Sequence, residues 1–189
     1  SIDSAVALIN KAKKPFIVWG QGVILGKAEE EFKDFVEKSG IPAAWTILGL
    51  SALPTSHELN VGMVGMHGNY GPNILTNKCD LLIAIGMRFD DRVTGDPSTY
   101  ASQAKIIHLE IDPAEVDKNI KVDVPVIGNC KESLKMITDR IDKRSHKKWI
   151  SKFDDLMKIE FDKVIKSDLS PNKKGLTMGE SIIAINEYT

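Results

Sequence analysis

The chain has 189 residues, 42% hydrophobic and 27% charged, which is typical of a soluble globular protein. A formal net charge of −1 argues against nucleic acid or an anionic membrane as a partner, and no apolar run is long enough to span a bilayer. The start of the chain lacks the features of a signal peptide, and the two cysteines are far apart in the sequence, so we expect a cytoplasmic protein with reduced thiols. Two distant cysteines and four scattered histidines do not make a metal site.

The first two-thirds of the chain alternates helix-like and strand-like patterns. A short amphipathic helix is predicted at the N-terminus, and the pattern over 28–40 predicts a second helix that ends at Gly40. A third helix is predicted over 71–80. Strands are predicted over 15–20, 41–46, 59–65, 81–87, 105–112 and 122–129. The continuous apolar run 81–87 is typical of a central strand buried on both faces.

This alternation predicts an α/β domain of three layers, Rossmann-like, with a mainly parallel sheet of roughly six strands. In such a sheet the carboxyl ends of the strands gather at one edge, and ligands bind there, near the point where the strand order reverses. The segments that follow the strands are therefore the candidates for chemistry.

The C-terminal third has no strand pattern. An apolar stripe over 146–166 predicts a helix, 167–177 is polar like a linker, and another helix begins at Met178. Because this helix stops with the chain, we expect a segment of a longer protein. We predict a central domain over 1–145, followed over 146–189 by a helix and linker that lead towards a further domain.

Glycines follow two of the predicted strands. Gly20 and Gly22 suit either close approach to a phosphate or ribityl group, or a tight strand-to-helix turn without a ligand. Leu25 stands where the third glycine of a dinucleotide fingerprint would be. The segment 61–71 is dense in glycine, and its methionines and His67 either line a binding site or belong to a surface loop.

The segment 86–95 directly follows the most apolar strand. Arg88 and Arg92 can clamp a pyrophosphate, and Asp90 and Asp91 can hold an arginine or accept from sugar hydroxyls. The alternative is a solvated charged loop. A metal site or an acid–base dyad at the aspartates is disfavoured, because adjacent side chains point in different directions.

Later strand ends carry acidic and amide groups. Glu110 and Asp112 are candidates for ribose hydroxyls or an adenine edge, although Asp112 before Pro113 also suits a helix N-cap. Gly128 and Asn129 end the last strand, where Asn129 either contacts an adenine or caps the next helix. Together these segments predict an extended, anionic, ring-bearing ligand across one edge of the sheet.

The motif GMRFDDRVTG, preceded by GMHG and followed by IDPAE, resembles the central domain of the acetolactate (acetohydroxyacid) synthase catalytic subunit, a thiamine-diphosphate-dependent enzyme. The resemblance covers about residues 1–140 and implies a DHS-like nucleotide-binding fold. It implies an enzyme that joins two pyruvates, or pyruvate and 2-oxobutyrate, with loss of carbon dioxide in branched-chain amino-acid synthesis. It also implies that this domain binds FAD, which has no net redox role in the reaction.

In the family, thiamine diphosphate and Mg²⁺ belong to the full-length enzyme, a homodimer or tetramer with a small regulatory subunit. The resemblance therefore implies no catalytic residue in this chain, no metal ligand and no activity of the chain alone. The FAD contacts that it implies are Gly20, Gly22, Thr46, Ile47, Gly65, Met66, His67, Gly68, Gly86, Arg88, Asp90, Arg92, Val93, Glu110, Ile111 and Gly128. Gln21 and Asn129 depart from the family pattern, which has glycine and aspartate at these positions.

Two other functions remain open. One is a stand-alone electron-transfer-type flavin or nucleotide carrier, which uses a similar domain. The other is a cofactor-free structural domain of a related thiamine-diphosphate enzyme. Bound flavin in the purified protein would exclude the cofactor-free domain.

Overall fold

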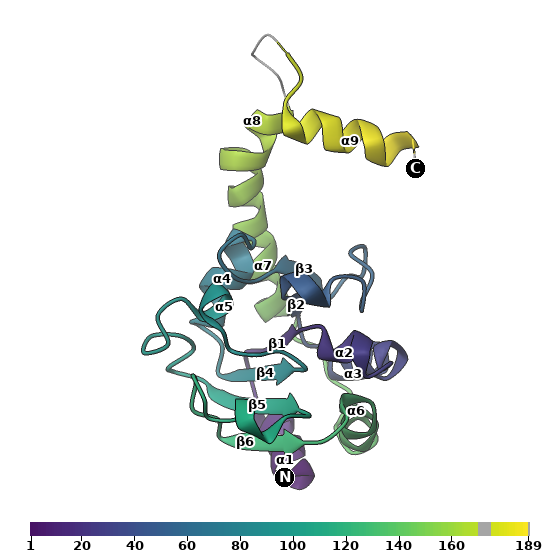
Figure 1. Cartoon of the computed structure of the whole chain (residues 1–189), viewed down its shortest axis with the longest axis vertical. Coiled ribbons are helices and arrows are strands. Elements are labelled where there is room, and N and C mark those ends of the chain that lie inside the picture. Colours follow the sequence, from purple (N-terminus) through teal and green to yellow (C-terminus); the bar gives the residue numbers. More distant parts are fainter. Residues whose placement is uncertain (170–174, 189) are drawn as a thin grey trace.

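The computed structural model describes residues 1–169 and 175–188, and its centre is a six-stranded parallel sheet (Figure 1). The strand order is β3-β2-β1-β4-β5-β6. The strands are β1 (Pro15–Trp19), β2 (Ala43–Trp45), β3 (Asn60–Met63), β4 (Leu81–Ile85), β5 (Lys105–Glu110) and β6 (Val124–Ile127). Every pairing is parallel, which confirms the predicted fold class.

Helices cover both faces of the sheet and make it the middle of three layers. On one face lie α1 (Ile2–Lys11), α3 (Glu29–Ser39) and α6 (Cys130–Thr138), and on the other lie α4 (Tyr70–Thr76) and α7 (Lys147–Glu160). Side chains alternate between the two cores because successive residues of a strand point to opposite faces. In β4, for example, Ile83 joins the first core and Leu82 the second.

Helix α3 shows how the sequence sets these elements. Phe32, Phe35 and Val36 fall on one helical face and are buried against the sheet. Three glutamates in the first turn place negative charge at the positive end of the helix dipole, which stabilises the helix. The helix ends at Gly40, whose φ of 63° is in the left-handed region that glycine adopts at low cost. The prediction of this helix and its end is confirmed.

The strand order reverses between β1 and β4, which are neighbours at the middle of the sheet. From β1 the chain continues to β2 and β3 on one side, and from β4 to β5 and β6 on the other. Short helical segments follow the strand ends at this edge, namely α2 (Gly22–Leu25), η1 (Ile47–Gly49), α5 (Asp91–Thr94) and η2 (Pro113–Glu115). The crevice between β1 and β4 is thus the expected place for a ligand.

The C-terminal part differs from the expected single helix over 146–166. Helix α7 ends at Glu160, and a π-helical segment, η3 (Phe161–Ile165), and α8 (Lys166–Leu169) follow, so the predicted linker 167–177 begins with helical residues. The rest of that linker lies largely at 170–174, outside the described residues. Helix α9 (Met178–Tyr188) lies with α8 away from the sheet (Figure 1).

Trp149 and Phe153 of α7 are buried in the second core, so the first half of this helix packs on the sheet domain. The Trp149 Nε1 group donates to the Pro15 carbonyl oxygen at 2.8 Å, which ties α7 to the start of β1. The division of the chain at residue 145 stays a prediction.

Candidate functional site

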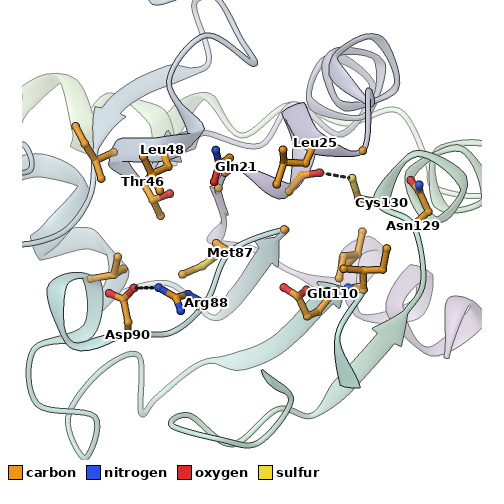
Figure 2. A pocket seen from close by; sticks show the side chains of 18 of the residues that line it. Gln21, Leu25, Thr46, Leu48, Met87, Arg88, Asp90, Glu110, Asn129 and Cys130 are labelled. Atoms are coloured by element: carbon orange, nitrogen blue, oxygen red, sulfur yellow. Dashed lines mark hydrogen bonds and ion pairs between the residues drawn. The ribbon is translucent and has the colours of Figure 1, made fainter. Parts of the chain in front are cut away.

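A pocket of about 480 Å³ opens where the strand order reverses, at the carboxyl ends of β1 and β4 (Figure 2). Its walls come from the segments that follow β1, β2, β4, β5 and β6. The binding residues expected from the sequence that line it are Gly20, Gly22, Thr46, Ile47, Gly86, Arg88, Asp90, Arg92, Val93, Glu110, Ile111 and Gly128. Segments far apart in the chain therefore meet around one space.

The glycines at the back of the pocket are packed against one another. The Gly22 amide donates to the Gly86 carbonyl oxygen at 2.9 Å, which joins the turn after β1 to the end of β4. A Cβ atom at Gly20 would lie 2.6 Å from the Gly86 oxygen, and one at Gly22 would lie 2.6 Å from the Gly86 Cα. Close contact between these two backbones explains why glycine is needed, whether or not a ligand binds. The two interpretations of Gly20 and Gly22 are therefore compatible.

The turn after β4 presents two arginines at the pocket. Arg88 Nη2 lies 3.4 Å from Asp90 Oδ2, and Arg92 Nε lies 3.8 Å from Asp91 Oδ2. Both guanidinium groups are largely exposed, so these pairs contribute little to stability and leave donors for an anion. The carboxylate of Asp90 also accepts from the Arg92 amide at 3.1 Å and caps α5, a role that the sequence did not predict.

Glu110 brings a buried carboxylate to the opposite wall. Its Oε1 accepts from the amides of Ile111 and Asp112 at 2.8 and 3.1 Å. The Glu110 Oε2 atom lies 3.7 Å from His108 Nε2, which itself lies 2.9 Å from the Met87 carbonyl oxygen. Burial is the largest influence on His108 and lowers its pKa, so the imidazole is neutral and donates from Nε2 to Met87. Glu110 thus keeps acceptor capacity facing the pocket.

The two residues left open between ligand binding and helix capping both act as caps. Asp112 accepts from the Ala114 amide at 2.9 Å at the start of η2, and it does not line the pocket. Asn129 accepts from the Lys131 amide at 2.9 Å at the start of α6 while also lining the pocket. Capping uses one oxygen of Asn129, so its amide NH₂ group stays available.

The glycine-dense segment after β3 lies beside the pocket but does not line it. Gly65, Met66, His67 and Gly68 are the expected binding residues that fall outside the lining. The Met66 amide nevertheless donates to the Arg92 carbonyl oxygen at 2.8 Å, so this loop and the arginine turn are at the same edge of the sheet. Met66 and His67 are both exposed.

Apolar side chains form much of the lining of the pocket and were missed as binding candidates, apart from Ile47, Val93 and Ile111. The exposed fractions of Leu25, Leu48 and Ile111 are 72%, 61% and 68%, and Ile47 is similarly exposed. Figure 2 shows Leu25 and Leu48 across the opening from Arg88 and Glu110. Their exposure at one opening, beside two cations, is the feature that suits a molecule with both a ring and negative charge. Leu25 and Leu48 lie in helical segments of four and three residues, which are too short for an apolar period to indicate which side chains are exposed.

One further lining residue is Cys130, whose thiol donates to the Gly22 carbonyl oxygen at 3.1 Å (Figure 2). Burial raises the pKa of this thiol, so the neutral form is favoured. Within residues 1–169 and 175–188, no group of three or more His, Cys, Asp or Glu side chains is arranged to hold a metal ion. No helix in these same ranges is long and apolar enough to cross a membrane.

A parallel sheet in the order 3-2-1-4-5-6, with a pocket at its switch point, defines the class of doubly wound α/β domains that place ligands at the carboxyl edge. Residues 2–137 match the family described as "Thiamine pyrophosphate enzyme, central domain", and the chain belongs to this family.

Curated relatives give the same result. The chain is 52% identical over 133 residues to the acetolactate synthase large subunit of Corynebacterium glutamicum. The matched segment covers 70% of this chain and 21% of that protein. It is 46% identical over 141 residues to the probable acetolactate synthase large subunit of Methanococcus aeolicus, covering 75% and 24%. For the large subunit of Buchnera aphidicola the values are 37% over 169 residues, 86% and 30%. The chain therefore spans less than a third of the length of these relatives.

Proposed function

We propose that this chain is the FAD-binding central domain of an acetolactate synthase large subunit. The whole enzyme then condenses two pyruvates, or pyruvate and 2-oxobutyrate, with release of carbon dioxide, and uses thiamine diphosphate and Mg²⁺ bound outside this domain. Support comes from relatives that carry this name and match most of the chain. The single observation that carries the cofactor assignment is the pocket that five strand ends form together.

The residues around the pocket fit an extended flavin nucleotide. Arg88 and Arg92 supply guanidinium donors suited to a pyrophosphate. The Glu110 carboxylate can accept from ribose hydroxyls, and the exposed apolar rim of Leu25 and Ile111 can cover an aromatic ring. In this proposal the protein binds and orients the cofactor through these groups, and the domain itself contributes no catalytic residue.

The loop 65–68 belongs to the same proposal as a neighbouring wall. Met66 and His67 are close to the arginine turn through the Met66–Arg92 backbone hydrogen bond. An elongated ligand that extends beyond the pocket from Arg92 would next meet this loop. We therefore retain Gly65, Met66, His67 and Gly68 as contacts of the part of FAD that lies outside the pocket.

Further parts of the proposal concern the whole protein. Its relatives are named large subunits, which is consistent with a small regulatory subunit as a partner. We propose that the domain is joined to flanking domains of the same chain in a cytoplasmic homodimer or tetramer.

A cofactor-free structural domain is the second candidate. The observation that favours it is the direct packing of Gly20 and Gly22 on Gly86, which explains these glycines without a ligand. The apolar rim and the two unburied arginines remain unexplained by this alternative.

Titration of the purified chain with FAD, followed by the quenching of flavin fluorescence, distinguishes the two candidates. We expect saturable binding of FAD and weaker binding of FMN, because FMN lacks the second phosphate and the adenosine. Riboflavin, which has no phosphate, should bind most weakly. If the chain shows a folded circular dichroism spectrum and does not bind FAD, the cofactor-free alternative is correct.

A further inference from the structure

A second groove lies at the opposite edge of the sheet. Its volume is about 650 Å³. Its walls are the segment before β1, the end of α4 with the residue Lys78 that follows it, and residues 148–156 of α7. Lys13 and Lys14 precede β1 and Lys78 precedes β4, so the groove is at the amino ends of the two central strands. It shares no residue with the pocket at the carboxyl edge.

The groove has a rigid apolar floor. The Trp149 indole is held by its 2.8 Å hydrogen bond to the Pro15 oxygen and by an edge contact with Phe153, with ring centroids 5.3 Å apart. Leu75 is buried beside it, and Leu156 is half-buried. Helices α4 and α7 pack side by side here (Figure 1), so the walls belong to the core of the domain and not to a loose surface segment.

The walls of the groove concentrate positive charge. Five lysines line it, together with a single carboxylate, Asp155. The lysines are Lys13, Lys14, Lys78, Lys148 and Lys152. Lys152 pairs with Asp155 at 3.7 Å, and within the described part of the chain no carboxylate lies within ion-pair distance of the other four ammonium groups. Since the whole chain has a net charge of −1, this excess of cations is local.

A nearby carboxylate that could neutralise the lysines is already engaged by the backbone. Asp80 accepts from the Lys13 and Lys14 amides at 2.8 and 2.9 Å. These bonds fix the main chain of both lysines at the rim of the groove and leave their ammonium groups unpaired. The fold therefore gathers five lysines near only two carboxylates, Asp155 and Asp80, and a bound anion would relieve the repulsion among the excess cations.

We propose that this groove binds a small molecule that carries two or more phosphate groups. Lysine ammonium groups bind phosphate as point charges, and several of them around one space favour a ligand with several negative charges. The volume is within the range of small-molecule sites. The apolar floor adds room for an uncharged part of such a ligand over Trp149. This site is independent of flavin binding at the other edge.

Calorimetric titration of the 189-residue chain with inorganic pyrophosphate, at physiological ionic strength, tests the proposal. Wild-type protein should bind pyrophosphate saturably and more tightly than citrate, which has comparable charge but only carboxylates. Lys148→Gln combined with Lys152→Gln should weaken binding about tenfold or more, because each charged hydrogen bond contributes substantially. Lys78→Gln, on another wall, should weaken binding in the same direction.

The matched control combines Lys33→Gln with Lys135→Gln, which removes the same charge from exposed helix positions outside the groove. This control should leave pyrophosphate binding unchanged, and circular dichroism should show all variants folded. The absence of binding by the wild type would overturn the proposal, as would equal affinity for citrate or an equal loss in the control. Undiminished binding by the variant that combines Lys148→Gln with Lys152→Gln would place the anion at another site and would also overturn it.

Discussion

Glycine at the switch point has a structural role that can be measured separately from ligand binding. Gly20→Ala would force a Cβ atom to within 2.6 Å of the Gly86 oxygen and 2.7 Å of the Met87 Cβ, and we expect a loss of about 1–3 kcal/mol of unfolding free energy. Gly71→Ala in α4 is the matched control, because the nearest atom to its Cβ would be the Phe153 carbonyl oxygen at 3.5 Å, an ordinary contact distance. Urea unfolding should show a change below about 1 kcal/mol for this control. Equal effects of the two substitutions would contradict the proposed packing role.

Arg92 tests the anion site at the level of one side chain. Arg92→Ala removes a guanidinium from the pocket but keeps the carbonyl that accepts from Met66, so the loop contact survives. We expect FAD affinity to fall by roughly tenfold to a hundredfold, as for the loss of a charged hydrogen bond. Arg140→Ala, an exposed arginine paired with Asp3 at 2.7 Å and absent from the pocket, should leave the dissociation constant unchanged. An unchanged constant for Arg92→Ala would refute its role.

At the residue scale, the sequence predicted positions better than roles. The position of a residue after a strand follows from the order of elements, so Arg88, Glu110 and Gly128 could be placed at the pocket in advance. Local hydrogen bonding is harder to foresee, since an Asx side chain can cap a helix, contact a ligand or do both. Asp112 and Asn129 illustrate this, and the cap formed by Asp90 was missed.

Helix α7 carries the main prediction at the scale of elements. Phe153, 1% exposed, packs on Phe16 of β1 with ring centroids 5.2 Å apart, whereas Phe161, at the start of η3, is 45% exposed. Phe153→Ala should lower the unfolding free energy of the sheet domain by about 3–5 kcal/mol, because it leaves a cavity in the core. Phe161→Ala should change it by no more than about 0.5 kcal/mol. Similar melting temperatures for the two variants would show that α7 is only a surface appendage.

Among the elements, apolar periodicity predicted the strands and the longer helices, because core packing imposes the same pattern. It failed where hydrogen bonding changes without a change in apolar spacing. The apolar stripe continues past Glu160, and the sequence therefore gave no indication of the π-helical segment Phe161–Ile165. Similarly, residues 167–169 are predicted as part of a linker because the apolar stripe weakens there, although they are helical in α8.

At the scale of the whole molecule, the proposal predicts that this chain alone does not release carbon dioxide from pyruvate. The chain spans less than a third of the length of the relatives compared above, and in the proposal thiamine diphosphate and Mg²⁺ bind outside this part. An assay of carbon dioxide release with added thiamine diphosphate and Mg²⁺ should give the background rate, while FAD binding is retained. Turnover above background would mean that the reacting groups lie within these residues.

The overall architecture was predictable because alternating strands and helices allow few arrangements, and right-handed crossovers fix which edge collects the loops. The loops 86–95 and 65–68 do meet at one edge, as the ligand hypothesis required. The groove at the opposite edge was not predicted. Its lysines come from three separate segments, which are brought together by the packing of α7 against α4 and against the start of β1.

The two outer strands of the sheet have a consequence for behaviour at high concentration. On β6 the exposed Pro125 has no amide hydrogen, and on β3 the backbone at Gly62 turns to a φ of 105°, which interrupts a regular strand. Neither border offers the long, regular row of donors and acceptors that another chain needs to add a strand. Both borders thus protect the domain against aggregation by edge-to-edge pairing.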